Sequence, residues 1–483
     1  MADAEDDEWD EVPAAAPEQA GLPPPEPLAF AMIRSFERVK DDRSASSPDG
    51  TGRLRFMINS RTWRNSWLLQ VILTDHGWAR VMVEQREWDL WWCAGQANTR
   101  AIRELLPFQR LNKFPKSSTL TLKANLYATV AAAAARCGEA HFAFMPKTYV
   151  LPTELGEFEA DRAQPHNVEA IWIVKPYAAY CGRGIFLLPN GAEVPEQVLE
   201  ERAVVSRYIE CPYLIDGLKS DIRLYVMVTC WHPLTVYIYE NGLVRFATDQ
   251  YTLDPSSLDN RTAHITNYSL NKRASNFVPT TAVDADGTGS KWTLDALRTR
   301  LTADHGEIAA AAAWRAINDL VVKTCIAAEP DMLAGYDKYV PEPVKAQPYA
   351  GLFQLYGFDV MLDDELKPWL LEVNLDPALG TDSPLDFKVK SGMLVDALNL
   401  LGLNGSPSAH GHGKAAAPAA AADARSRLTP EQVRKWRALA QVNAELERNR
   451  PGGWHRLMPC AEPGAHSQLF EAGRDLNALP FAR

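Results

Sequence analysis

The sequence predicts an α+β protein. Between residues 51 and 403, strand-like runs rich in β-branched and aromatic residues alternate with helix-like segments. Two pairs of these runs are separated by short turn segments, which favours antiparallel hairpins. A chain of 483 residues is long enough for two to four domains with a sizeable core.

The predicted elements follow from local patterns. Strands are expected over 171–174, 204–209, 224–229 and 236–240. Asn241-Gly242 separates the last of these from 243–248, which predicts a type I′ hairpin. A second hairpin is expected over 353–362 and 368–374, with 363–367 as its turn. Helices are predicted over 122–136 and 309–328, each containing five consecutive alanines.

The two ends of the chain differ from this body. Residues 1–50 are acidic and rich in Pro and Ala, so we expect a disordered tail. Residues 404–427 form an Ala/Gly/Pro linker, and 428–483 form an extension with one helix that begins near Thr429 and ends before Pro451. That helix either packs on the body or binds a partner.

Composition limits the possible functions. The net charge of −11 argues against nucleic acid and, taken alone, against acidic partners. However, the first 50 residues hold 13 acids and 4 bases, so most of the excess lies in the tail. No apolar run reaches membrane-spanning length, and the N-terminus does not resemble a targeting segment. Seven cysteines without a Cys-x-x-Cys pair favour a reducing compartment.

A polar cluster is predicted on the second hairpin. Strand alternation places Phe358, Val360 and Leu362 on one face, and Trp369, Leu371 and Val373 can share it. Three polar side chains then fall together on the opposite face, namely Asp359, Glu372 and Asn374. Two carboxylates and an amide oxygen suit Mg²⁺. The alternative is a solvated polar face without a metal.

Two further segments carry charge in patterns typical of phosphate sites. Lys175 ends a predicted strand and is followed by Gly182-Arg183-Gly184, which favours either a phosphate-holding loop or an ordinary hairpin loop. Neither a Walker sequence nor the Rossmann glycine pattern is present. Every second residue of one predicted strand is charged, so three side chains project from the same face: Lys219, Asp221 and Arg223. This pattern favours either an organised site or an exposed salt-bridge ladder.

Together these segments resemble the tubulin-tyrosine-ligase-like family, whose fold is of the ATP-grasp type. The resemblance covers about residues 51–403 and is carried by 173–176 with 182–185, 208–209 with 214–225, 242–248, HITNYSLNK at 264–272, FQLYGFDVMLDDELKPWLLEVN at 353–374 and TDSPLDFKVK at 381–390. Residues 428–457 are similar to the segment that follows the catalytic body in the polyglutamylase branch. The resemblance implies an N-terminal lobe over 51–119, a central lobe over 120–207 and a C-terminal lobe over 208–403, with ATP held between the last two.

The resemblance also implies roles for individual residues. It implies ATP contacts for Lys123, Lys175, Ser206, Arg207, Tyr208, Ile209, Lys219, Asp221, His264, Thr266 and Asn267. It implies Mg²⁺ ligation by Asp359, Glu372 and Asn374, and catalytic positions near the γ-phosphate for Arg223 and Arg245. Arg183, Lys388 and Lys390 are candidates for carboxylate contacts, with plain surface solvation as the alternative for the two lysines. The sequence departs from the family pattern at Gln354, where Glu is usual, and at Asp376 and Ser220.

The activity implied is ATP- and Mg²⁺-dependent ligation of free glutamate to glutamate side chains in the acidic C-terminal tails of tubulin. The acceptor carboxylate would become an acylphosphate, and the amine of free glutamate would then form an isopeptide bond. The expected protein is a monomer of the cytoplasm and cytoskeleton, with the cilium or basal body as a further location, and has no nucleic-acid partner or membrane insertion. The alternatives are a glycine or tyrosine ligase, a ligase for a non-tubulin acceptor, and a non-catalytic microtubule-binding scaffold.

Overall fold

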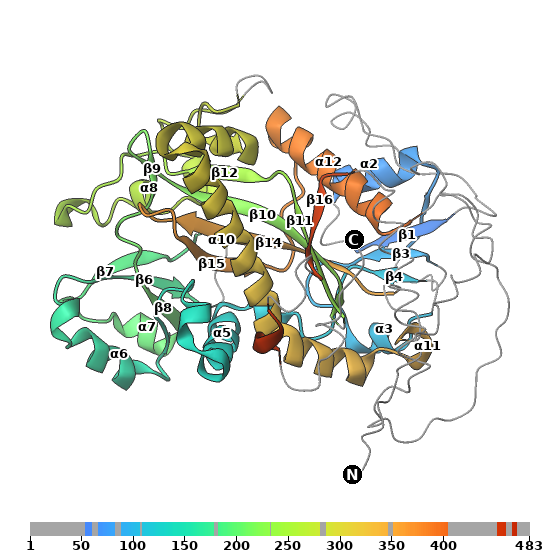
Figure 1. Ribbon diagram of the computed structural model, residues 1–483, viewed down its shortest axis with the longest axis horizontal. Coiled ribbons are helices and arrows are strands. Elements are labelled where there is room, and N and C mark those ends of the chain that lie inside the picture. The colour runs from blue at the N-terminus through green and yellow to red at the C-terminus, as the bar shows by residue number, and fades with distance from the viewer. Residues whose placement is uncertain are drawn as a thin grey trace, which may run out of the picture.

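The computed structural model describes residues 54–59, 66–82, 88–106, 109–177, 182–231, 233–280, 286–345, 351–403, 452–459 and 466–470. Over these residues the chain forms three β-sheets that helices connect and cover (Figure 1). One sheet is parallel and two are antiparallel, which confirms the predicted α+β class. The predicted acidic tail, the linker and the predicted helix beginning near Thr429 lie outside the described residues.

The N-terminal sheet is parallel, with the order β2-β1-β3-β4. Its strands are β1 (Arg55–Ile58), β2 (Ala79–Arg80), β3 (Leu90–Trp92) and β4 (Arg110–Leu111). The helices α2 (Trp67–Asp75) and α3 (Thr99–Arg103) connect them. A bridge between Leu111 and Leu352 joins this sheet to the rest of the molecule.

The central sheet is antiparallel, with the order β5-β8-β6-β7. Its strands are β5 (Thr148–Leu151), β6 (Ile171–Pro176), β7 (Phe186–Pro189) and β8 (Ala203–Arg207). Helices α6 (Leu155–Arg162) and α7 (Glu196–Glu200) accompany it. Tyr149, Phe158 and Trp172 meet in its separate core, with the rings of Phe158 and Trp172 5.0 Å apart.

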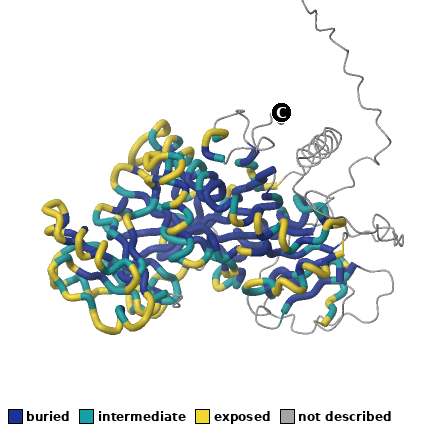
Figure 2. The backbone as a smooth tube through the Cα atoms, turned by 90° about the horizontal axis from the view of Figure 1, so that it is seen from below, coloured by how far each residue is buried: buried dark blue, intermediate teal, exposed yellow. Residues whose placement is uncertain are grey.

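The large sheet is built around the 14-residue strand β10 (Leu218–Trp231). Its other strands are β9 (Leu214–Ile215), β11 (Leu234–Tyr239), β12 (Leu243–Phe246), β13 (Lys291–Thr293), β14 (Gln354–Leu362), β15 (Pro368–Asn374) and β16 (Trp454–Met458). β16 comes from the C-terminal extension and pairs with β11. The buried residues of this sheet run through the middle of the molecule (Figure 2).

Three longer helices pack around the large sheet. They are α5 (Lys123–Cys137), α10 (Leu294–Tyr339) and α12 (Pro384–Leu400). The shorter helices are α4 (Ser118–Thr121), α8 (Arg261–His264), α9 (Tyr268–Asn271) and α11 (Glu342–Lys345), with 3₁₀ turns at Glu139–Phe142, Pro165–Asn167, Pro255–Ser257 and Ser467–Leu469. Both alanine-rich helices predicted from sequence are confirmed, and no described helix has the length and apolarity to span a membrane.

The predicted hairpin at Asn241-Gly242 is wrong. β11 and β12 do not pair with each other; both pair with β10, at residues 226–231 and 220–223, on the edge that β14 leaves open. β11 and β12 therefore lie end to end along the same edge of β10. Neither Asn241 nor Gly242 has the positive φ that a type I′ turn requires. Gly242 is needed for close approach, because a Cβ there would lie 2.3 Å from the carbonyl oxygen of Arg223.

The second hairpin is confirmed, but one detail of its faces is wrong. Asp359 pairs with Glu372, and the register then shifts so that Val360 pairs with Leu370. This bulge leaves Leu371 without an opposite residue and turns Trp369 away from the core. Leu370 fills the core position instead and is only 1% exposed. Asp359, Glu372 and Asn374 still share one face, as predicted.

Candidate active site

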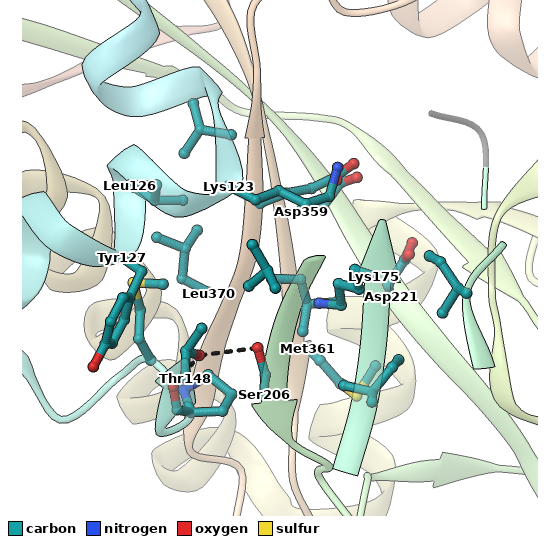
Figure 3. A pocket seen from close by; sticks show the side chains of 18 of the residues that line it. Lys123, Leu126, Tyr127, Thr148, Lys175, Ser206, Asp221, Asp359, Met361 and Leu370 are labelled. Carbon is teal, nitrogen blue, oxygen red and sulfur yellow. Dashed lines mark hydrogen bonds and ion pairs between the residues drawn. The ribbon is translucent and has the colours of Figure 1, made fainter. Parts of the chain in front are cut away.

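A cavity of about 340 Å³ lies between the central sheet and the large sheet, next to the start of α5 (Figure 3). Every residue predicted to bind ATP or metal lines it. In Figure 3, Lys175 and Asp221 lie on one side of the cavity, and Leu126, Tyr127 and Leu370 lie on the other. The cavity thus combines a charged side with an apolar side, a combination typical of small-molecule sites.

A buried network of arginines and carboxylates supports the charged side. Arg223 binds Asp359 with two hydrogen bonds, of 2.6 Å from Nε and 3.1 Å from Nη2. Arg245 binds Asp221 in the same manner, at 2.6 and 2.7 Å, and its Nη2 also donates to Asp359 Oδ2 at 2.8 Å. Thr266 Oγ1 donates to Asp221 Oδ2 at 2.6 Å. The two arginines do not line the cavity; they lie behind the two aspartates that do.

The network fixes the charge state of its members. Burial alone would raise the pKa of Asp359, but Arg223 and Arg245 outweigh it and hold that pKa well below the usual range. For Arg245, the attraction of Asp221 and Asp359 outweighs burial and raises its pKa well above the ordinary value. Asp359 is therefore a carboxylate throughout the physiological range, and it contributes a fixed negative charge to the cavity.

The three predicted metal ligands converge. Asn374 Nδ2 lies 3.1 Å from Glu372 Oε1 and 3.3 Å from Asp359 Oδ2. Mg²⁺ at its usual bond lengths spaces neighbouring oxygen ligands about 2.9 Å apart, and rotation of the Asn374 amide by half a turn would place Oδ1 at the same point. The donor set fits Mg²⁺ in size and chemistry. Lys123 Nζ lies 3.5 Å from the other oxygen of Glu372.

A hydrogen-bond chain holds a second lysine at the cavity. Lys219 Nζ donates to Tyr208 Oη at 2.7 Å and lies 4.1 Å from the centre of that ring. Tyr208 Oη lies 3.0 Å from His264 Nδ1, and His264 Nε2 lies 3.2 Å from the Ser257 carbonyl oxygen. Burial, together with nearby Lys175, lowers the pKa of Lys219 to about 7. Burial and Lys219 in turn lower the pKa of His264.

Lys175 lies at the end of β6, beside a glycine loop. Burial lowers its pKa to about 8, although Glu372 partly opposes this. Gly182 and Gly184 both have positive φ. A Cβ at Gly182 would lie 2.9 Å from Asn267 Oδ1, so glycine permits the loop to approach the other side of the cavity.

The predicted substrate contacts are not brought to the cavity. Arg183, Lys388 and Lys390 are all absent from its lining. Arg183 and Lys388 are exposed. Lys390 is buried and binds Asp386 Oδ1 at 2.9 Å and the Gly380 carbonyl oxygen. The two lysines of α12 therefore occupy different environments.

Sequence reasoning missed several residues near the site. Met361 lines the cavity two residues after Asp359, a position that alternation could have indicated. Lys113, only 1% exposed, binds Asp376 at 2.7 Å, and Asp376 also accepts from Gly95 N at 2.7 Å. Because Lys113 and Asp376 are 263 residues apart, no local sequence pattern predicts that they pair. Gln354 lies away from the cavity and accepts hydrogen bonds from Phe114 N and Ser117 Oγ.

Comparison with known proteins decides the family. The family model described as "Tubulin-tyrosine ligase family" matches residues 100–409. The chain belongs to this family.

Among its relatives, the tubulin polyglutamylase TTLL5 of Mus musculus is 38% identical over 339 residues, which are 70% of this chain and 24% of the relative. The tubulin monoglutamylase TTLL4 of Homo sapiens is 34% identical over 455 residues, covering 86% of this chain and 37% of the relative. The tubulin polyglutamylase TTLL7 of Homo sapiens is 33% identical over 343 residues, covering 70% of this chain and 37% of the relative. The chain thus spans between 24% and 37% of the length of these relatives.

Proposed function

We propose that this family member is an ATP- and Mg²⁺-dependent ligase that joins free glutamate to glutamate side chains of tubulin C-terminal tails. The observation that carries the proposal is the cavity in which Asp359, backed by two arginines, converges with Glu372 and Asn374. The names of the relatives support tubulin as the protein substrate and glutamate as the group added.

The roles of the chain's own residues follow from their positions. The segment at 206–209 and apolar residues such as Ile173 and Met361 line the side suited to a flat base. Lys123, Lys175 and Lys219 would hold the phosphates, since each is a cation at the cavity. Arg223 and Arg245 would keep Asp359 ionised, would orient Asp221 and Asp359, and would add positive charge near the transferring phosphoryl group.

Asp359, Glu372 and Asn374 would hold Mg²⁺, which neutralises phosphate charge when bound. The chemistry needs activation because a carboxylate is a poor electrophile. The acceptor's γ-carboxylate oxygen attacks the γ-phosphorus of ATP, and the bond to the β-phosphate oxygen breaks, which gives an acylphosphate and ADP. The amine nitrogen of free glutamate then attacks the acyl carbon, loses a proton and expels phosphate.

This function places the protein on microtubules in the cytoplasm, including those of cilia and basal bodies, and the chain would act as a monomer. The acceptor tails are acidic, whereas the chain's own acidic excess is concentrated in residues 1–50 of the sequence, and the described residues that line the cavity begin at Leu120. A large repulsion between enzyme and substrate is therefore not implied by the net charge.

The test is incorporation of labelled amino acid into microtubules. Wild type should incorporate glutamate only with ATP and Mg²⁺, and should use glycine and tyrosine poorly. Glu372→Gln removes one charge from the proposed metal set, so incorporation should fall by about a hundred-fold or more. A matched control is Glu365→Gln, an exposed residue in the turn of the same hairpin. Equal incorporation by wild type and Glu372→Gln would refute the metal assignment, and a preference for glycine or tyrosine would refute the substrate.

A further inference from the structure

The segment that follows β15 leads directly from the cavity to the N-terminal sheet. Leu375 lines the cavity, immediately after Asn374. Asp376 then accepts two hydrogen bonds of 2.7 Å, one from Lys113 Nζ and one from the backbone N–H of Gly95. Gly95 follows β3 and Lys113 follows β4, which are neighbours in the parallel sheet. One carboxylate therefore joins the ends of two parallel strands to the strand that carries Asn374.

Lys113 is a buried cation that depends on this carboxylate. Its side chain is 1% exposed, whereas that of Asp376 is 34% exposed. Among the residues that the structure describes, Asp376 is the only acidic side chain within 4.0 Å of Lys113 Nζ. Removal of an ammonium group from water is costly unless a partner of opposite charge is close. The pair therefore resists separation, because movement of Asp376 would leave a buried charge without its carboxylate.

The backbone around Lys113 is itself fixed to the first strand of the hairpin. Phe114 N and Ser117 Oγ both donate to Gln354 Oε1, at 3.0 and 2.6 Å. Gln354 begins β14, at the same end of the hairpin as the segment after β15. Residues 113–117 therefore contact both strands of the hairpin, one through Gln354 and the other through Asp376.

The next residue, Pro377, packs over β14 beside the arginine network. A Cβ at Gly357 would lie 3.0 Å from Pro377 Cβ and 3.2 Å from Arg223 Nε, so glycine permits this close approach. Gly357 pairs with Asn374, whose Nδ2 lies 3.4 Å from the Gly357 carbonyl oxygen. A displacement of the segment after Asn374 would therefore disturb both the amide of Asn374 and the surroundings of Arg223.

We infer that Asp376 is a positioning residue for the proposed metal site: held by Lys113 and Gly95, it fixes the backbone that carries Asn374. Asp376 does not line the cavity, so it acts through Asn374 and not on a ligand directly. Mg²⁺ accepts little departure from octahedral geometry, and its affinity depends on the residues that hold its ligands in place. The inference rests on the proposed function for its metal, and adds to it a contribution from the N-terminal sheet.

The experiment measures Mn²⁺ binding by electron paramagnetic resonance, using the full chain and a non-hydrolysable ATP analogue. Mn²⁺ takes the same oxygen ligands as Mg²⁺. Asp376→Asn and Lys113→Met should each weaken Mn²⁺ binding by about tenfold or more. Binding of the analogue without metal should change by less than about threefold, since no contact with the nucleotide is removed. Exposed Asp364→Asn, in the turn at the opposite end of the hairpin, is the matched control and should equal wild type.

The double variant Lys113→Met/Asp376→Asn separates positioning from stability. Asp376→Asn alone leaves a buried ammonium group without its carboxylate, so the midpoint of thermal unfolding should fall. The double variant contains neither charge and should recover much of that loss. Its Mn²⁺ affinity should stay low, because no ion pair holds the segment after Asn374. Recovery of Mn²⁺ affinity in parallel with stability would show a merely structural role and overturn the inference.

The remaining outcomes distinguish this inference from the proposed function. If wild type binds Mn²⁺ and ligates glutamate, but both single variants bind Mn²⁺ as tightly as wild type, the positioning role is overturned and the ligase function stands. If the single variants bind Mn²⁺ more weakly but wild type ligates no glutamate, the positioning role stands and the ligase function fails. If wild type binds no Mn²⁺, the metal site and the positioning role both fail.

Discussion

The two sheets that flank the cavity differ in whether their charged side chains are paired with residues of opposite charge. On the large sheet, Asp221 and Asp359 are each bound by an arginine at 2.6 Å. On the central sheet, Lys175 is only partly buried, and no carboxylate of the described residues lies within 4.0 Å of its Nζ. Its pKa falls to about 8, whereas that of Asp359 is held far below the ordinary value.

This difference separates two tasks. The network of the large sheet is complete before any ligand binds, so it can orient charge at no further cost when the ligand arrives. Lys175 gains a partner only from an anionic ligand, and until then its burial opposes folding. Changes to the paired charges of the large sheet should therefore lower both stability and catalytic rate. Replacement of Lys175 on the central sheet should instead weaken ligand binding and raise the stability of the ligand-free protein.

The largest effect is expected for Asp359→Asn. The substitution leaves Arg223 and Arg245 buried with one carboxylate between them, which should lower the free energy of unfolding by about 3–5 kcal/mol. Activity should fall by about a hundred-fold or more. Chemical denaturation and labelled-glutamate incorporation measure the two effects. A variant with wild-type stability would show that the network does not hold the sheet together.

An intermediate effect is expected for Lys175→Met. ATP affinity should fall by about 10- to 100-fold. The ligand-free protein should become more stable, because the folded pKa of about 8 lies below the unfolded value of 10.5. The unfolded chain then binds more protons between these values, so wild-type stability rises with pH across this window. The gain from Met should be greatest below pH 8 and should shrink towards pH 10.5.

Denaturant unfolding at several pH values, together with ATP titration, tests this prediction. Exposed Lys388→Met serves as the control, since it should change neither quantity. A destabilised Lys175→Met protein at neutral pH would mean that Lys175 has a favourable partner in the ligand-free state.

The smallest effect is expected for Ser206→Ala on the central sheet. Thr148 Oγ1 donates to Ser206 Oγ at 2.9 Å, so its loss should cost about 1 kcal/mol of stability and change ATP affinity by less than about threefold. The double variant Thr148→Val/Ser206→Ala should be less damaging than the sum of the two single changes. A loss of affinity comparable with that of Lys175→Met would show that the hydroxyl pair contacts the ligand.

Sequence patterns predicted the features that depend on the alternation of side chains between the two faces of a strand. Asp359, Glu372 and Asn374 were expected on one face, and the register confirms it. The bulge at Leu371 was not predictable, because nothing in a run of Leu and Trp marks where the pairing slips. Asn241-Gly242 favours a tight turn locally, but pairing of both flanking strands with β10 overrides that preference.

Long-range charge pairs were the hardest to predict. Lys388 and Lys390 are equivalent candidates in the sequence, yet one is exposed and the other is buried against Asp386. Only the packing of α12 against the large sheet distinguishes them. The partners of Lys113 and Lys291 lie 263 and 95 residues away, at distances where no periodicity applies.

The pairing of β16 with β11 has a practical consequence for shortened forms of the protein. Residues 454–458 cover the outer edge of β11 and satisfy its backbone N–H and C=O groups. A chain cut after residue 403 would keep every cavity-lining residue, but the six-residue edge of β11 would be open to another strand. Such a fragment should self-associate at concentrations at which the full chain does not.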